Sequence, residues 1–238
     1  MHPQPNPAPG RNGRYARSSC YRAAVAVWVC LLRAVNLGKQ RKLPMPALRG
    51  ALTAAGMTDV RTYLQSGNVI ARSQLQEHQQ VCDLVRAVIA EEFSLDVPVI
   101  TRRPAEIDEV IAANPFSNEA AQRAHLIRVI FLAAVPPSAR IDQLMSDNSL
   151  RQTCRVIGSH VYVDYVRGYH NTGRTAPWFT RALGVDGTER NWRTVLALPA
   201  LVRELTKQPD QLPPLVRIPG RTPRQKTRSP GQRRRGRD

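Results

Sequence analysis

A continuous apolar run near the start of the chain constrains the fold more than any other feature. Residues Ala24–Leu32 have the sequence AVAVWVCLL, with no polar side chain on either face. A strand of this kind has to be covered on both faces. Arginines precede the run, as they do in a signal peptide, but no small-residue cleavage site follows it. The run is also shorter than the ~20 residues that a membrane span needs. We therefore predict a buried first strand and no membrane partner.

The residues after this run alternate between helical and extended patterns. Apolar side chains recur every three or four residues over 47–56 and again over 81–89, where they form one stripe. Two short strands are predicted between these helices, at Val60–Leu64 and Val69–Arg72, and another follows at Val97–Thr101. The proline within that last strand places it at the edge of a sheet, because proline cannot donate a backbone hydrogen bond.

This order, β-α-β-β-α-β, is that of the ferredoxin-like unit, in which two helices cover one face of a sheet. We assign it to residues 23–116. A second unit of similar plan is predicted over residues 124–208, with strands at Leu126–Ala133, Arg155–Ile157 and His160–Val166 and helices at Pro137–Met145, Pro177–Leu183 and Asn191–Thr206. Its last strand is not evident unless Leu215–Ile218 supplies it. The predicted fold class is therefore α+β, with two ferredoxin-like (βαββαβ) units packed together.

The net charge of +17 is concentrated at the two ends of the chain. Residues 217–238 hold nine Arg or Lys and one Asp, and residues 1–22 hold four Arg and no acid, which leaves about +5 for the middle. The ends, 1–22 and 209–238, are rich in Pro, Gly and basic residues, so disordered basic termini are predicted. A basic tail attracts polyanions without sequence preference. Non-specific binding of nucleic acid through Arg221–Arg237 is thus one alternative function.

The four cysteines, Cys20, Cys30, Cys82 and Cys154, are widely spaced and form no C-x-x-C pair. This spacing suits a reducing compartment, and we predict a cytoplasmic protein. His78 and Cys82 lie four residues apart and could share one face of a helix, which is half of a metal site. No second pair of ligands accompanies them, so neither a metal nor another cofactor is predicted.

Six segments of the chain are characteristic when they are taken together. They are LLRAVNLG at 31–38, KLPMPALRGALTAAGMTDVRTYLQSGNVI at 42–70, ANPF at 113–116, GYHNTGRT at 168–175, RALGV at 181–185 and TERNWRTV at 188–195. This set resembles a bacterial family known as domain of unknown function 1697, over about 27–205. The resemblance implies two ferredoxin-like halves, a cytoplasmic protein and no established activity. Ala34 and Lys39 stand where the family usually has glycine, whereas Asn36 and Gly38 remain.

The polar tetrapeptide Gln65-Ser66-Gly67-Asn68 interrupts an apolar stretch. Gly and Asn supply the positive φ that a hairpin tip needs, so a tight turn explains two of the four residues. A turn does not require a long amide, and we expect Gln65, Ser66 and Asn68 to border a polar, ligand-binding surface. We expect this turn and the loop after the first strand to lie at opposite ends of the sheet, so that Asn36 comes near the hairpin only if the loop folds back, and we claim no contact between Gln65 and Asn36.

The loop RAVNLGKQRKLP carries several cations and precedes a helix that begins near a proline. Its candidate ligand-binding residues are Arg33, Asn36, Gly38 and Lys42. Free N–H groups at a helix N-terminus, together with such cations, suit an anion such as phosphate. The loop lacks the Walker spacing G-x-x-x-x-G-K-[ST]. A solvated basic loop is the alternative that the sequence leaves open.

Two later segments look like helix starts that are flanked by arginine. Thr175 and Asn191 are the candidate N-caps, and Arg174 and Arg190 stand beside them. Two helix N-termini with arginines would make a second region favourable to anions, although capping alone is a sufficient explanation. Trp192, next to the second cap, is predicted to be a core or interface anchor.

The predicted function is the binding of a small anionic ligand, which bears phosphate or carboxylate, between the two halves. No catalytic residue is assigned, since G-x-S-x-G, paired carboxylates and a Cys-His-Asn pattern are not evident. Asp164 is predicted to be an outward-facing strand residue. The predicted strand at 69–72 has no aromatic side chain, which disfavours stacking of RNA bases on the first sheet. A non-catalytic module that assembles through exposed sheets is a further alternative, and the oligomeric state is left open.

Overall fold

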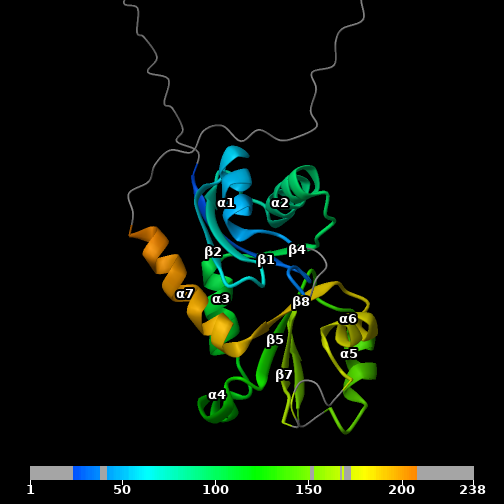
Figure 1. Ribbon diagram of the computed structural model, residues 1–238. Coiled ribbons are helices and arrows are strands. Elements are labelled where there is room, and N and C mark those ends of the chain that lie inside the picture. The colour runs from blue at the N-terminus through cyan, green and yellow to red at the C-terminus, as the bar shows by residue number, and fades with distance from the viewer. Residues whose placement is uncertain (1–23, 38–41, 151–152, 167, 169–172, 208–238) are drawn as a thin grey trace, which may run out of the picture.

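The computed structural model describes residues 24–37, 42–150, 153–166, 168 and 173–207. This part of the chain is a mixed α+β structure with two four-stranded antiparallel sheets and seven helices. Figure 1 shows two units, one above the other in this view. None of the described helices combines the length and the apolar content that crossing a bilayer requires. The predicted disordered ends and the predicted nucleic-acid-binding tail lie outside the described residues.

The first unit contains six elements in the order strand, helix, strand, strand, helix, strand. They are β1 (Ala26–Leu32), α1 (Met45–Ala54), β2 (Thr58–Tyr63), β3 (Asn68–Ser73), α2 (His78–Phe93) and β4 (Val99–Arg102). The strands lie in the order β2-β3-β1-β4, and β1 is antiparallel to both of its neighbours. β4 is therefore an edge strand, as the proline beside it predicts.

The alternation of side chains along β1 explains why this strand is apolar on both faces. Trp28, Cys30 and Leu32 pack into a core with α1 and α2. Val29 and Leu31 point the other way, into a second core that the two units share. All five side chains are fully buried. The prediction of a first strand that is covered on both faces is confirmed.

The second unit repeats this arrangement. It consists of β5 (Ile127–Leu132), α5 (Ser138–Met145), β6 (Cys154–Ile157), β7 (His160–Asp164), α6 (Ala176–Leu183) and β8 (Gly187–Asn191). Its strand order, β6-β7-β5-β8, matches that of the first sheet position by position. The remaining helices are α3 (Pro104–Ala112), α4 (Ser117–Arg123) and α7 (Trp192–Thr206). The sequence analysis does not predict α4.

β8 is a second element that the sequence pattern conceals. Its sequence, GTERN, has no apolar side chain and looks like the start of the following helix. Thr188 and Arg190 are nevertheless buried, because both donate hydrogen bonds to the first unit. β8 pairs with β5 and fills the place for which the sequence suggested Leu215–Ile218. Those residues lie outside the described part of the chain.

The two sheets pack face to face through an apolar core. Val29 and Leu31 contribute to it from the first sheet, and Val129 and Phe131 from the second. α3 and α7 pack against each other and cover one side of this junction (Figure 1). Both faces of the first sheet are thus covered within the chain. The sheet surface on which RNA-recognition domains stack bases is therefore occupied by the second unit.

Two expectations about single residues have different outcomes. Trp192 is 5% exposed and belongs to the junction core, so the prediction of an anchor is confirmed. The expectation that Asp164 faces outward is wrong. This residue is 4% exposed, and its carboxylate accepts a hydrogen bond from Arg123 at 2.5 Å. Arg123 lies in α4, the helix that the sequence does not predict, so the ion pair could not be anticipated.

Substitution of Gly67 by alanine is expected to destabilise the protein more than the same change at Gly158. Both glycines have positive φ, +75° and +55°, in the turns before β3 and β7. A Cβ atom on Gly67 would lie 2.7 Å from side-chain atoms of Leu32 and Val35, whereas one on Gly158 would meet nothing within 4 Å. We expect urea unfolding to show a loss of about 1 kcal/mol for Gly158→Ala and roughly 2 kcal/mol more for Gly67→Ala. Equal losses would contradict this packing.

Candidate functional site

A buried arginine of the second unit reaches into the first unit. Arg190, in β8, is 5% exposed. Its Nη2 donates to the carbonyl oxygens of Leu32 at 2.8 Å and Gly67 at 3.1 Å, and its Nε donates to Oδ1 of Asn68 at 2.5 Å. A guanidinium has five N–H donors in a fixed fork, which suits such a convergent set of acceptors. Burial lowers the pKa of Arg190 to about 10, so the side chain is charged at neutral pH.

An arginine of the first unit makes the reciprocal contact. Arg102, at the end of β4, is 6% exposed, and burial lowers the pKa of its guanidinium. Its Nη2 donates to the carbonyl oxygen of Leu132 at 2.8 Å and to Oγ of Ser159 at 3.0 Å. Its Nε donates to Nε2 of His160 at 3.1 Å. Among the described residues no acidic side chain forms an ion pair with either arginine.

The two sets of contacts occupy equivalent places in the two units. Each arginine comes from a fourth strand, and each reaches the end of a first strand and the turn before a third strand. The backbone repeats this match, since Leu32 N donates to Gly67 O at 2.8 Å and Leu132 N donates to Ser159 O at 2.9 Å. The chain thus has an internal two-fold pattern, in which each unit anchors the other through one arginine.

His160 accepts the Arg102 Nε–H, so its Nε2 has to be unprotonated. Burial, followed in size by the charge of Arg102, lowers the pKa of His160 from the usual 6.5 to about 3. The imidazole is therefore neutral at physiological pH and can act as an acceptor. In the other unit the amide oxygen of Asn68 provides the equivalent acceptor for Arg190.

A hollow of about 460 Å³ opens at the junction of the two units, beside Arg102. One of its walls is formed by α2 and β4, and includes His78 and Thr101. The opposite wall is formed by the loop after β5 and the turn before β7, and includes Val135 and Ser159. Pockets that bind small molecules have volumes from about 300 Å³ upward. The hollow is therefore large enough for such a ligand.

The α2 wall of the hollow carries the two residues whose spacing suggested half of a metal site. His78 and Cys82 both line the hollow, on one face of the helix. His78 Nδ1 lies 3.1 Å from Oγ1 of Thr101, and Cys82 Sγ donates to the carbonyl oxygen of Val99 at 3.3 Å. Burial raises the pKa of Cys82, so this residue is a thiol at neutral pH. Across the described ranges no three His, Cys, Asp or Glu side chains gather as a metal site.

The β2–β3 turn and the loop after β1 lie together, so the prediction that they lie at opposite ends of the sheet is wrong. Because β3 is antiparallel to β1, its first residue, Asn68, pairs with Leu31 near the end of β1. Asn36 Nδ2 donates to the carbonyl oxygen of Gln65 at 2.8 Å, a contact for which the sequence offered no claim. Asn36 exchanges two further hydrogen bonds with the backbone of Leu43, so it joins the turn to the loop.

Some of the predicted ligand-binding residues come together, but they do so inside the junction. The carbonyl oxygen of Ser66 and the amide oxygen of Asn68 both accept hydrogen bonds from Arg190. Asn68 is fully buried and Arg190 nearly so. In the structure these side chains hold the two units together, and a role for them in ligand binding stays a prediction.

Arg33 and Arg174 lie at opposite ends of α6. Arg33 forms an ion pair with Asp186, which follows the helix, at 2.5 Å. Arg174 precedes the helix, pairs with Asp147 at 2.8 Å and lies 5.5 Å from the centre of the Trp178 ring. A helix of eight residues spans about 12 Å. A ligand that contacts both arginines would therefore have to extend along α6, and their shared role in binding stays a prediction.

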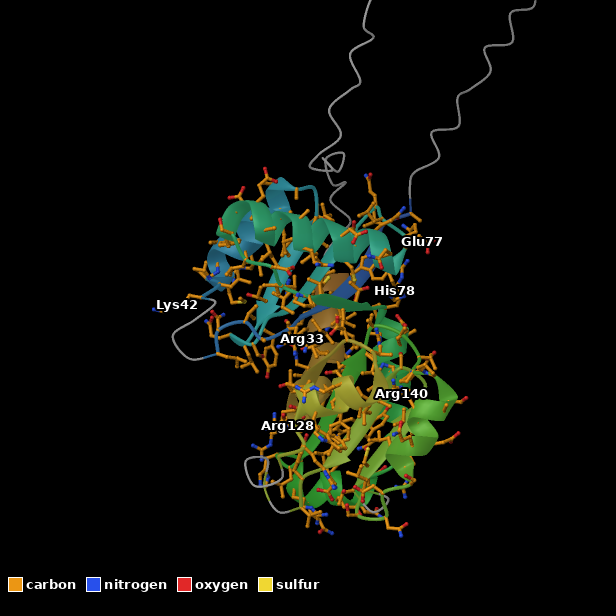
Figure 2. The ribbon with its side chains drawn as sticks, turned by 90° about the vertical axis from the view of Figure 1, so that its right-hand side faces the viewer. Arg33, Lys42, Glu77, His78, Arg128 and Arg140 are labelled. Carbon is orange, nitrogen blue, oxygen red and sulfur yellow. The ribbon has the colours of Figure 1, made fainter. Side chains whose placement is uncertain are left out.

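The remaining predicted residues have separate positions. Asn191 caps α7, where its Oδ1 accepts a backbone N–H of the first turn at 3.0 Å, so the predicted cap is confirmed. Thr175 occupies the N-cap position of α6 without a capping hydrogen bond from its side chain. Lys42 is exposed at the outer edge of the first unit, whereas Arg33 lies at the junction (Figure 2). Gly38 lies outside the described residues.

The sequence analysis does not identify Arg102, Ser159 or His160. One signal could have revealed the first of them. Each fourth strand has an arginine two residues before the start of the next helix, in Arg102-Arg103-Pro104 and in Arg190-Asn191-Trp192. Alignment of the two units of the chain would have shown this repeat. The burial of Arg102 was still not foreseeable, because arginine is rarely buried unless it is paired.

Comparisons with known proteins agree with the sequence resemblance. A family model with the description Protein of unknown function (DUF1697) matches residues 25–162. No curated protein matches the chain. Among solved structures, the chain is similar to the conserved bacterial protein SP0830 from Streptococcus pneumoniae, with 18% sequence identity and a TM-score of 0.50. The similarity covers 75% of this chain and 99% of that chain, and at this identity it concerns the fold alone.

Replacement of Arg190 by methionine is expected to destabilise the protein by about 3 kcal/mol, because buried carbonyl and amide oxygens lose their donor. Arg190→Lys is expected to recover only part of this loss, since an ammonium cannot reproduce the fork. The exposed Arg193 is a matched control, and Arg193→Met should change the free energy of unfolding by about 0.5 kcal/mol or less. Urea unfolding gives the free energy of unfolding of all three variants. Equal losses in the two methionine variants would contradict the role of Arg190 in joining the units.

Replacement of His160 by asparagine is expected to remove a pH dependence of stability. The unfolded imidazole takes up a proton as the pH falls through 6.5, whereas the folded one stays neutral down to about pH 3. Protonation therefore favours the unfolded state in this window, and stability falls with the pH. An asparagine at position 160 offers an amide oxygen as acceptor for Arg102, as Asn68 does for Arg190, and it does not titrate. Between pH 7 and pH 5 the wild type should lose about 2 kcal/mol more than His160→Asn. Parallel pH profiles from urea unfolding would contradict the neutral-imidazole assignment.

Proposed function

This chain belongs to the family of proteins of unknown function DUF1697, and we propose that it binds a small molecule with a phosphate or carboxylate group in the hollow between its two units. The ligand class is the one that the sequence analysis predicts. The residues proposed to meet it are different, because the hollow is lined by α2, β4 and the β5–α5 loop.

One observation carries the proposal: the hollow is lined by a buried arginine that forms no direct ion pair with an acidic side chain among the described residues. The Arg102 guanidinium donates its hydrogen bonds to neutral acceptors, and the charge of Glu106 opposes the lowering of its pKa by burial without forming an ion pair with it. Burial of a charge is costly unless a counter-charge accompanies it. An anionic group bound in the hollow would supply this counter-charge in a region where water screens it little.

The rest of the lining suits a ligand with one anionic and one apolar part. The N-terminal end of α2 favours negative charge, and the side chain of its N-cap residue, Glu77, accepts no capping hydrogen bond there. Val99, Ala133 and Val135 provide apolar surface. Glu106 and Asp186 also line the hollow. These two carboxylates would accept hydrogen bonds from hydroxyl or amino groups of the ligand, and would fix its orientation.

The proposal concerns binding and assigns no reaction. Cys82 is the cysteine that lines the hollow, and its raised pKa keeps the weakly nucleophilic thiol form. His78 Nε2 lies 3.3 Å from a carboxylate oxygen of Glu106. A general base needs a substrate within hydrogen-bond reach before a role can be assigned.

We further assign both units to the ferredoxin-like class. The β-α-β-β-α-β order of each unit supports this assignment, and so do the matching strand orders β2-β3-β1-β4 and β6-β7-β5-β8. In each unit the first strand lies between the third and the fourth strands. The internal two-fold pattern is then a pairing of two such units through their sheet faces.

A thermal-shift series on the full chain tests the binding proposal. The ligands are inorganic phosphate, pyrophosphate, citrate and a nucleoside monophosphate, at matched ionic strength. A ligand at 100 times its Kd stabilises the folded state by about 2.7 kcal/mol, which raises Tm by roughly 5–10 °C. At least one ligand of the panel should produce such a concentration-dependent rise.

Two alanine-to-tryptophan variants locate the effect. Ala134 is exposed and lines the hollow, so Ala134→Trp should fill it and reduce the rise in Tm. Ala139 is exposed on α5 and is not part of the lining, so Ala139→Trp should keep the rise. The proposal fails if no ligand raises Tm, or if the rise is the same in both variants.

A further inference from the structure

A second hollow, of about 390 Å³, lies on the other unit of the molecule. It is formed along α6 and the residues that follow this helix, with Thr180, Arg181 and Gly184 on the helix side. Arg33, from the loop after β1, lines it on the side of the first unit. Asp186, which follows α6, also lines it and pairs with Arg33. All of these residues belong to the described part of the chain.

The second hollow is the two-fold counterpart of the first one. The first hollow lies between the second helix and fourth strand of one unit and the loop after the first strand of the other. The second hollow combines α6, the residues that lead into β8 and the loop after β1 in a similar way. The backbone confirms the match, since Arg33 N donates to Pro98 O at 2.9 Å and Ala133 N donates to Asp186 O at 2.8 Å.

The equivalent positions carry different side chains, and this changes the charge of the two hollows. Arg33 stands in the second hollow where Ala133 stands in the first. Arg181 adds a second guanidinium from the exposed side of α6. Asp186 is the acidic residue of this lining, so the formal charge is positive. Side chains with planar N–H donors and positive charge are the usual partners of phosphate and carboxylate groups.

The ion pair between Arg33 and Asp186 does not block this hollow. The side chain of Asp186 is 71% exposed and that of Arg33 is 29% exposed. Exposed ion pairs contribute little to stability, because water competes for both charges. Arg33 can therefore exchange the carboxylate of Asp186 for an external anion at small cost. Among the described residues no acidic side chain pairs with Arg181, so its donors are free for the same anion.

We propose that this second hollow is a separate anion-binding site, in which Arg33 and Arg181 together bind one phosphate or carboxylate group. The inference goes beyond the proposed function, because it concerns other residues and does not require that the first hollow be occupied. Asp186 lines both hollows and competes with the anion for Arg33. The affinity of the second site is therefore set in part by the wall that it shares with the first.

The test is an NMR titration of the full chain with inorganic phosphate, in which the backbone amide signals of Gly184 and Val185 are followed. Phosphate should shift both signals in a saturable way. Arg181→Ala should weaken the binding at least fivefold. Arg140 is a matched control, since it is an exposed arginine on α5 outside this lining, and Arg140→Ala should leave the Kd unchanged.

A charge-removing variant of Asp186 gives a result that a purely structural role would not produce. Asp186→Asn should bind phosphate at this site more tightly than the wild type, because Arg33 loses its competing carboxylate. The inference is overturned if the Gly184 and Val185 signals do not respond, if Arg181→Ala and Arg140→Ala weaken binding equally, or if Asp186→Asn binds less tightly.

The same titration of Ala134→Trp separates the two sites. This variant fills the first hollow and leaves Arg33 and Arg181 in place. Saturable shifts of Gly184 and Val185 should persist in it. If they persist while the ligand panel has no effect at the first hollow, the proposed function fails and the second site stands. If they disappear with the first hollow filled, the second site is not independent and this inference fails.

Discussion

The reciprocal insertion of two arginines is the interaction on which the rest of this structure depends. Arg102 and Arg190 each leave a fourth strand and donate hydrogen bonds to the first-strand end and the hairpin turn of the other unit. The apolar junction core is not directional, because burial of apolar surface does not specify one register of two sheets. Two forks of N–H donors, aimed at fixed carbonyl oxygens, are directional. They therefore specify how the units sit, and with that the shape of both hollows.

The sequence predicts the first unit well because the signals for its strands and helices are local. The apolar run of β1, the stripe of α2 and the proline beside β4 each depend on side-chain periodicity or on a missing N–H. The second unit is harder, because contacts with the first unit determine part of it. β8 consists of polar residues, and Thr188 and Arg190 are buried only because the end of β1 accepts their hydrogen bonds. The five residues of β8 alone carry no pattern that reveals these contacts with the first unit.

The candidate site shows the same limit. Sequence analysis selects Ser66, Asn68 and Arg190, and the structure does bring these residues together. The polar side chains of Asn68 and Arg190 serve the junction between the units, where buried polar groups need hydrogen-bond partners, and Ser66 contributes its backbone carbonyl oxygen. Arg102 and Ser159 have no individual signal, since single arginines and serines are common at surfaces. Comparison of the two units reveals Arg102, because the equivalent position in β8 also carries arginine. The hollows follow from this repeat, and their linings differ where the two copies have diverged.

The burial of the two arginines is open to direct measurement by the hydrogen exchange of arginine Nε–H groups, followed by ¹⁵N NMR of the full chain. An exposed guanidinium exchanges rapidly with water, whereas one enclosed between two units exchanges only when the junction opens. We expect strongly protected Nε–H signals, one of which is lost in Arg102→Lys and another in Arg190→Lys, while that of the buried Arg72 persists in both variants. Exchange of all arginine Nε–H groups at the rate of exposed side chains would contradict it.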